Sequence, residues 1–314
     1  MTTTLITVNG TGSPDPFGPG FSGELGANIG GDASWNRVWH ELTGDNPRWY
    51  WQPIGYPAAT FPMGPSVQAG RAQVNQQIGL RPKGTKLALS GYSQGALVVD
   101  YVWRDDILNP QGQHHDRLGD VVGIVNFGDP MRCPGVCNGN VHAGFPIPGQ
   151  LDGFTTGGIS GPSDLKPDQT PDFLLSCNND GDLYGAAPVG DAPWTTAPGV
   201  GHDETLIFNL VQNFDGVNLL AFVQEAMTTL GVAMAGGINL GTLISVTEAA
   251  IVGALGTGGI PGIPAAGAQT PDHVVAIVEA LLNGGMFVMR GFGPHGDYEK
   301  YVPAMLDFLN SVAA

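Results

Sequence analysis

Positively charged side chains are scarce in this sequence. The 314 residues include 12 Lys and Arg against 28 Asp and Glu, a formal net charge of −16 at pH 7. Proteins that bind nucleic acids or anionic membrane surfaces need a cationic face to neutralise phosphate groups. The composition therefore argues against binding to nucleic acids or to anionic membrane surfaces. It is compatible with a neutral or lipidic substrate.

Cysteine is also rare, and the usual metal and nucleotide motifs are missing. An odd set of three cysteines, Cys133, Cys137 and Cys177, does not build a disulfide-stapled scaffold. A Cys133–Cys137 bridge outside the cell and three reduced thiols remain alternatives. Cys133, Cys137 and His142 lack a fourth ligand at zinc-site spacing, and the chain has no His-Glu-x-x-His, Walker or dinucleotide fingerprint. We expect no metal and no cofactor.

The first ten residues, MTTTLITVNG, lack the basic and long apolar regions of a signal peptide. One stretch, residues 226–247, is uncharged and long enough to span a bilayer. However, Glu225 and Glu248 flank it where basic residues are usual, and it contains four glycines and four threonines. We therefore expect packed apolar helices there and no integral membrane segment.

Short apolar runs alternate with helical patterns along the chain. The runs cover residues 4–8, 86–90, 120–130 and 171–177, and the helical patterns cover 65–79 and 94–108. This alternation predicts an α/β sandwich with a mostly parallel central sheet. Residues 131–170 are rich in Gly and Pro and predict loops. Further helical patterns predict an insertion at about 186–285 within a single domain, residues 1–314.

A Gly-x-Ser-x-Gly sequence, GYSQG at residues 91–95, separates an apolar run from a helical pattern. In a chain with 49 glycines the motif alone is weak evidence for a catalytic serine. Its position between a predicted strand and a predicted helix is the stronger evidence. A nucleophile elbow needs a strand leading in, a helix leading out and small residues around the serine. Ser93 is therefore the candidate nucleophile, and the N–H of Gln94 would form half of an oxyanion hole.

A nucleophilic serine needs a base and an acid, which follow it in the order Ser, Asp, His in this architecture. His295, in a turn-rich loop before the last apolar run, is the best base, and His142 is the reserve. Asp182 leads as the acid because it follows a predicted strand, with Asp180 and Asp129 as rivals. The remaining histidines fit surface or upstream positions: His40, His114, His115, His202 and His273.

Five ordered motifs resemble lysin B, the mycolylarabinogalactan esterase family of phages that infect mycobacteria and their relatives. They are VNGTGSPDPFGPG (8–20), WQPIGYPAATFPMGPSVQAG (51–70), GYSQGALVV (91–99), NDGDLYG (179–185) and PHGDYEKYVPAMLDFL (294–309). The resemblance implies a cutinase-like α/β-hydrolase fold, with the helical insertion preceding the catalytic histidine. It implies the catalytic set Ser93, Asp182 and His295, and Thr11 as the second oxyanion donor beside Gln94.

The resemblance also implies hydrolysis of the ester between mycolic acids and arabinogalactan. The expected setting is a phage-encoded protein made in the host cytoplasm that acts on the host envelope after release. Two features depart from the family: the insertion looks long, and Cys177 lacks the partner that cutinases place after the catalytic acid. A cutinase or lipase acting on other lipid esters, and a non-catalytic wall-binding phage protein, are the alternatives.

Overall fold

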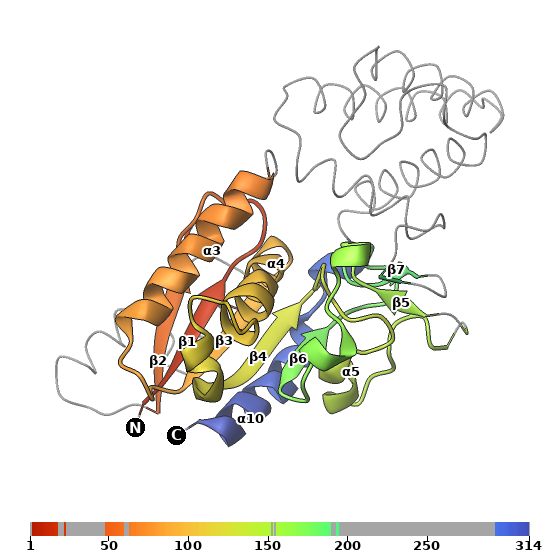
Figure 1. Ribbon diagram of the computed structural model, residues 1–314. Helices are drawn as coiled ribbons and strands as arrows, with labels where there is room; N and C mark the ends of the chain where they lie inside the picture. Colours follow the sequence, from red (N-terminus) through yellow and green to blue (C-terminus); the bar gives the residue numbers. More distant parts are fainter. Residues whose placement is uncertain are drawn as a thin grey trace, which may run out of the picture.

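We describe the protein from a computed structural model (Figure 1). The residues described are 2–17, 22, 48–59, 63–151, 153, 155–189, 193–194 and 293–313. Most of the predicted insertion at 186–285, including residues 226–247, lies outside them, so the single-domain prediction stays a prediction. None of the helices in the described part of the chain is both long and apolar enough to cross a membrane.

Five parallel strands form the central sheet, in the order β2-β1-β3-β4-β6. They are β1 (Thr3–Val8), β2 (Trp49–Ile54), β3 (Leu87–Tyr92), β4 (Val121–Phe127) and β6 (Leu174–Cys177). The predicted α/β architecture with a parallel sheet is confirmed. Strand β2, at one edge of this sheet, was not predicted from the sequence.

Helices cover both faces of the sheet (Figure 1). On one face lie α3 (Met63–Leu80) and α4 (Gln94–Tyr101), and on the other lie α5 (Asn138–His142) and α10 (Val302–Val312). A strand turns alternate side chains to opposite faces, so neighbouring residues enter different cores. Ile6 and Leu89 join the core under α3 and α4, whereas Leu5 and Ala88 join the core under α10.

The helix predicted over residues 94–108 changes from an α-helix to a π-helix about halfway along. It is α-helical to Tyr101 and continues as a π-helix, Val102–Leu108. Apolar spacing does not distinguish these two hydrogen-bond registers, so the sequence predicted one continuous helix.

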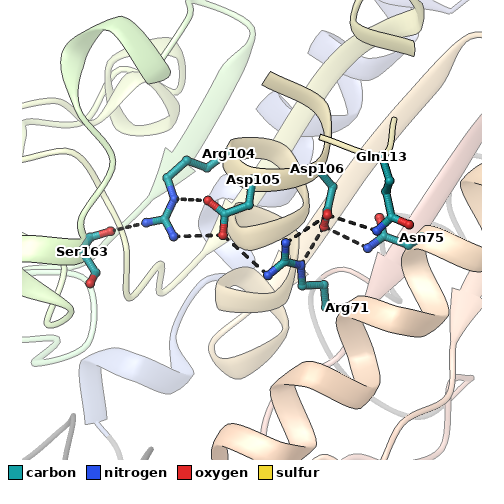
Figure 2. A network of polar contacts seen from close by, with 7 residues as sticks. All are labelled: Arg71, Asn75, Arg104, Asp105, Asp106, Gln113 and Ser163. Atoms are coloured by element: carbon teal, nitrogen blue, oxygen red, sulfur yellow. Dashed lines mark hydrogen bonds and ion pairs between the residues drawn. The ribbon is translucent and has the colours of Figure 1, made fainter. Parts of the chain in front are cut away.

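A polar network ties this π-helical segment to α3 (Figure 2). The buried Asp106 carboxylate accepts hydrogen bonds from Arg71, at 2.7 and 2.9 Å, from Asn75 at 2.9 Å and from Gln113 at 3.1 Å. Arg71 also lies 3.6 Å from Asp105. The network fixes the far end of the helix that begins beside Ser93.

The stretch from 131 to 170 is mostly irregular, as predicted, but its described residues include short 3-10 helices, Gly161–Ser163 and Pro167–Gln169, and two further regular elements. One is α5, and the other is β5 (Thr156–Gly157), which pairs antiparallel with β7 (Ala187–Pro188). All three cysteines are buried and free, so the alternative of a Cys133–Cys137 bridge does not hold in this structure.

Candidate active site

Ser93 occupies the sharp turn between β3 and α4. Its backbone has φ 55° and ψ −120°, a left-handed conformation that is strained for a residue with a side chain. Its N–H donates to the carbonyl of Phe127, the last residue of β4, at 2.9 Å. The surrounding structure thus holds the serine at the carboxyl end of the sheet, where ligands bind in open α/β folds.

The glycines on either side of Ser93 are required for close backbone approach. A Cβ at Gly95 would lie 2.0 Å from the carbonyl oxygen of Val8, and one at Gly91 would lie 2.4 Å from Cα of Ala96. Real Cβ atoms do not approach backbone this closely, so both positions exclude larger residues. The strand–turn–helix context predicted from GYSQG is confirmed.

The structure brings Asp182 and His295 together. Both side chains are buried, and Nδ1 of His295 lies 2.9 Å from Oδ1 and 3.0 Å from Oδ2 of Asp182. The carboxylate also accepts the Tyr184 N–H at 2.9 Å and the Tyr298 hydroxyl. Burial opposes ionisation of Asp182, but His295 and these donors lower its pKa below the usual value.

The rival acids and the reserve base are engaged elsewhere. Asp129 accepts the Met131 N–H and the Ser176 hydroxyl, and Asp180 accepts the Gly149 N–H at 2.7 Å. His142 lies on α5, where its ring meets Phe308 edge-on at 5.7 Å. Of the three carboxylates considered from sequence, Asp182 is the one that bonds to His295.

A side-chain amide connects the acid loop to the segment that carries His295. Nδ2 of Asn179 donates to the carbonyls of Pro294, at 2.7 Å, and Asp297, at 2.8 Å. The amide oxygen of Asn179 accepts the Tyr301 hydroxyl at 3.1 Å. These bonds fix the backbone on both sides of His295, which limits movement of its ring relative to Asp182.

Two tyrosine rings lie nearly parallel to the imidazole of His295. Tyr92 has its centroid 5.3 Å away with 25° between the ring planes, and Tyr184 has its centroid 4.7 Å away with 30° between them. The Tyr92 hydroxyl also donates to the carbonyl of His295 at 2.8 Å. Since Tyr92 directly precedes Ser93, this contact joins the serine turn to the histidine segment.

Thr11 and Gln94 lie beside each other at the start of α4. Nε2 of Gln94 donates to Oγ1 of Thr11 at 3.2 Å and to the carbonyl of Ala59 at 2.9 Å. Its Oε1 accepts the Ser66 hydroxyl at 2.9 Å. The side chain of Gln94 therefore ties the exposed loop after β1 to the first turn of α4, where backbone N–H groups face outward.

The roles of these tyrosines and of Asn179 were not predicted from the sequence. A signal was present, since each of the three site motifs contains a tyrosine: Tyr92 in GYSQG, Tyr184 in NDGDLYG and Tyr298 in PHGDYEKY. No group of three or more His, Cys, Asp or Glu side chains among the described residues is arranged to hold a metal ion.

The parallel sheet, the strained serine between strand and helix, and the Asp–His pair at the same end of the sheet define the α/β-hydrolase fold. Within this class the sequence is similar to Endolysin B of Mycobacterium phages L5 and D29. It is 40% and 39% identical to them over 135 residues, which make up 42% of this chain and 47% of each relative. The chain thus spans about half the length of the curated relatives it matches. No model of a known protein family matches it.

Solved structures with related folds were also found. Lysin B from Mycobacteriophage D29 is 25% identical, with a TM-score of 0.49 over 90% of this chain and 98% of its own. A cutinase-like protein from Cryptococcus sp. is 17% identical, with a TM-score of 0.38 over 67% of this chain and 89% of its own. The catalytic core of acetyl xylan esterase from Trichoderma reesei is 16% identical, with a TM-score of 0.38 over 66% and 93%.

Proposed function

We propose that the protein is a serine esterase whose catalytic residues are Ser93, Asp182 and His295. The observation that carries this proposal is the buried hydrogen bond between His295 and Asp182 at the end of the sheet where Ser93 is held in a strained turn. A buried carboxylate orients the imidazole beside it and stabilises its charged form. An imidazole held in this way can act as the base for a nucleophilic serine.

The chemistry then follows in two steps. His295 takes the proton of the Ser93 hydroxyl as the serine oxygen attacks the acyl carbonyl, and the imidazolium returns that proton to the departing alcohol. Water then attacks the acyl-enzyme carbonyl while His295 takes its proton. The imidazolium returns that proton to the Ser93 oxygen, and the carboxylic acid is released. The Gln94 N–H, with Thr11, stabilises the oxyanion in both steps. Asp182 stays ionised throughout, in keeping with its lowered pKa.

The substrate we propose is the ester between mycolic acid and arabinogalactan in the envelope of a mycobacterial-type host, cleaved during phage lysis. Support comes from the five lysin B motifs and from the 40% and 39% identity to Endolysin B of two mycobacteriophages over 135 residues. The absence of a cationic excess agrees with an uncharged lipid ester. In this proposal residues 1–314 form a single catalytic domain.

Mass spectrometry of lipids released from purified mycolyl-arabinogalactan tests this function. The parent should release free mycolic acids, and Ser93→Ala should release none. Ser311→Ala is the matched control, because Ser311 is exposed on α10 and bonds only locally to the Phe308 carbonyl. An active parent that cleaves short p-nitrophenyl esters but releases no mycolate would instead support a cutinase or lipase acting on other lipid esters.

A further inference from the structure

Besides His295, a second side chain bonds to the Asp182 carboxylate. The hydroxyl of Tyr298 donates to Oδ2 of Asp182, and both side chains have no exposed surface. Tyr298 stands only three residues after His295 in the chain. One short segment therefore supplies two groups to the same carboxylate, the imidazole of His295 and the phenol of Tyr298.

The donors divide the two carboxylate oxygens between them. Oδ1 accepts the Tyr184 N–H at 2.9 Å, and Oδ2 accepts the Tyr298 hydroxyl, while Nδ1 of His295 lies within 3.0 Å of each oxygen. Without the phenol, Oδ2 would lose one donor and would share the imidazole N–H of His295 with Oδ1. A buried anion that loses a donor becomes more basic.

The ring of Tyr298 is fixed on several sides. It meets the rings of Tyr92, Phe127 and His295 at centroid distances of 6.2, 6.1 and 6.2 Å, each at a steep interplanar angle. Burial and the adjacent carboxylate raise the pKa of Tyr298 well above its usual value, so the phenol keeps its proton and remains a donor. A rigid ring aims this hydroxyl at Oδ2 without the entropy cost of ordering it in each turnover.

We infer that Tyr298 is a positioning residue for the esterase reaction, which sets the orientation and basicity of Asp182 and, through it, of His295. This inference rests on the proposed function, since it assigns Tyr298 a role toward that site. The Tyr298 hydroxyl is buried against the Asp182 carboxylate, so its effect passes through that carboxylate.

The test compares pH profiles of kcat/KM for the parent and Tyr298→Phe, using p-nitrophenyl butyrate followed at a wavelength where phenol and phenolate absorb equally. The variant keeps the ring and removes the donor. We expect kcat to fall about tenfold. The acid limb of the kcat/KM profile should move to higher pH by about half a unit or more. The Asp182 carboxylate, with one donor fewer, would stabilise the protonated imidazole of His295 more strongly.

Tyr301→Phe is the matched control. It removes a buried hydroxyl from the same segment, one that bonds to Asn178 and Asn179 and not to Asp182. Its acid limb should stay at the parental pH even if its rate changes. In an Asp182→Asn background, Tyr298→Phe should cost little further activity, because the partner through which it acts has been altered.

Several results would overturn the inference. An unshifted acid limb in Tyr298→Phe, or full additivity with Asp182→Asn, would show that the tyrosine only packs. Should Tyr298→Phe not fold, site-specific 3-fluorotyrosine at position 298 keeps the hydroxyl and makes it more acidic with a small change in ring size. The acid limb of the kcat/KM profile should then move to lower pH. An inactive parent, or an active Ser93→Ala, would instead refute the proposed function, which keeps the two failures distinct.

Discussion

Tyr92 holds His295 at two points: its ring stacks on the imidazole with centroids 5.3 Å apart, and its hydroxyl bonds to the His295 carbonyl at 2.8 Å. The residue that precedes the candidate nucleophile thus positions the candidate base. Ser93 and His295 are 202 residues apart in sequence, and this contact links the turn of one to the segment of the other.

Tyr92 substitutions should separate these two contacts. Tyr92→Phe keeps the stacked ring and loses the hydroxyl, so we expect kcat to fall by about three- to tenfold, as for one hydrogen bond. Tyr92→Leu also loses the stacked ring and should cost clearly more. Steady-state kinetics on a short p-nitrophenyl ester measures both. Equal activity in the two variants would show that the ring contributes nothing to the placement of His295.

Asp182→Asn should reduce kcat by about three to four orders of magnitude, because an amide neither stabilises the imidazolium nor fixes its tautomer. Asp180→Asn is the matched control two residues away. Its side chain accepts the Gly149 N–H at 2.7 Å, which an amide oxygen also accepts, so activity should stay close to that of the parent. Loss of activity in Asp129→Asn with full activity in Asp182→Asn would make Asp129 the acid.

Gly95→Ala should prevent the serine turn from closing, since the new Cβ would lie 2.0 Å from the Val8 carbonyl oxygen and 2.6 Å from that of Asn9. Both clashes are with backbone, and overpacking of this kind costs about 1–3 kcal/mol or more. Chemical denaturation should show this loss together with reduced activity. Gly119→Ala is the control, because a Cβ there meets nothing within 4 Å, and its stability should match the parent's.

Asp106→Asn should lower the free energy of unfolding at pH 7 by about 2 kcal/mol, since Asp106 carries the network between α3 and the π-helical segment. Burial opposes ionisation of Asp106, but the hydrogen bonds from Arg71, Asn75 and Gln113 lower its pKa below its usual value. Because the folded pKa is the lower one, this stability is present above the unfolded pKa and is lost as pH falls through the folded pKa.

Urea midpoints measured from pH 7 down to pH 3 check this dependence. The difference in urea midpoint between the parent and Asp106→Asn should be largest near neutral pH and should become smaller in acid. Asp105→Asn is the control on the same segment: its side chain is 31% exposed, and exposed ion pairs contribute less than about 1 kcal/mol. A difference in urea midpoint that grows as pH falls would contradict the assigned role of Asp106.

The serine turn is specified by local sequence. The strand before Ser93, the glycines beside it and the helix after it lie within 22 residues, 87–108, and their apolar spacing and turn residues specify the motif. Strand β2 was missed because the run from Trp49 to Ile54 mixes aromatics with Gln52 and Pro53 and does not form an unbroken apolar strand pattern.

The acid could not be selected by local pattern. Asp129, Asp180 and Asp182 all follow neighbouring parallel strands and therefore gather at the same sheet edge. Which one meets His295 depends on a segment 113 residues further along the chain and on the Asn179 bonds that fix it. Tyr298 was missed for the same reason, since its hydroxyl acquires a role only when that segment folds against Asp182.

The most direct test of the central claim is to identify the residue that reacts with a p-nitrophenyl alkylphosphonate. The serine oxygen would displace p-nitrophenolate from phosphorus and leave a stable phosphonyl ester, which peptide mass spectrometry locates. We expect one adduct, on Ser93, which forms in the parent and forms much more slowly in Asp182→Asn. An adduct on another residue, or undiminished ester hydrolysis by Ser93→Ala, would contradict the central claim.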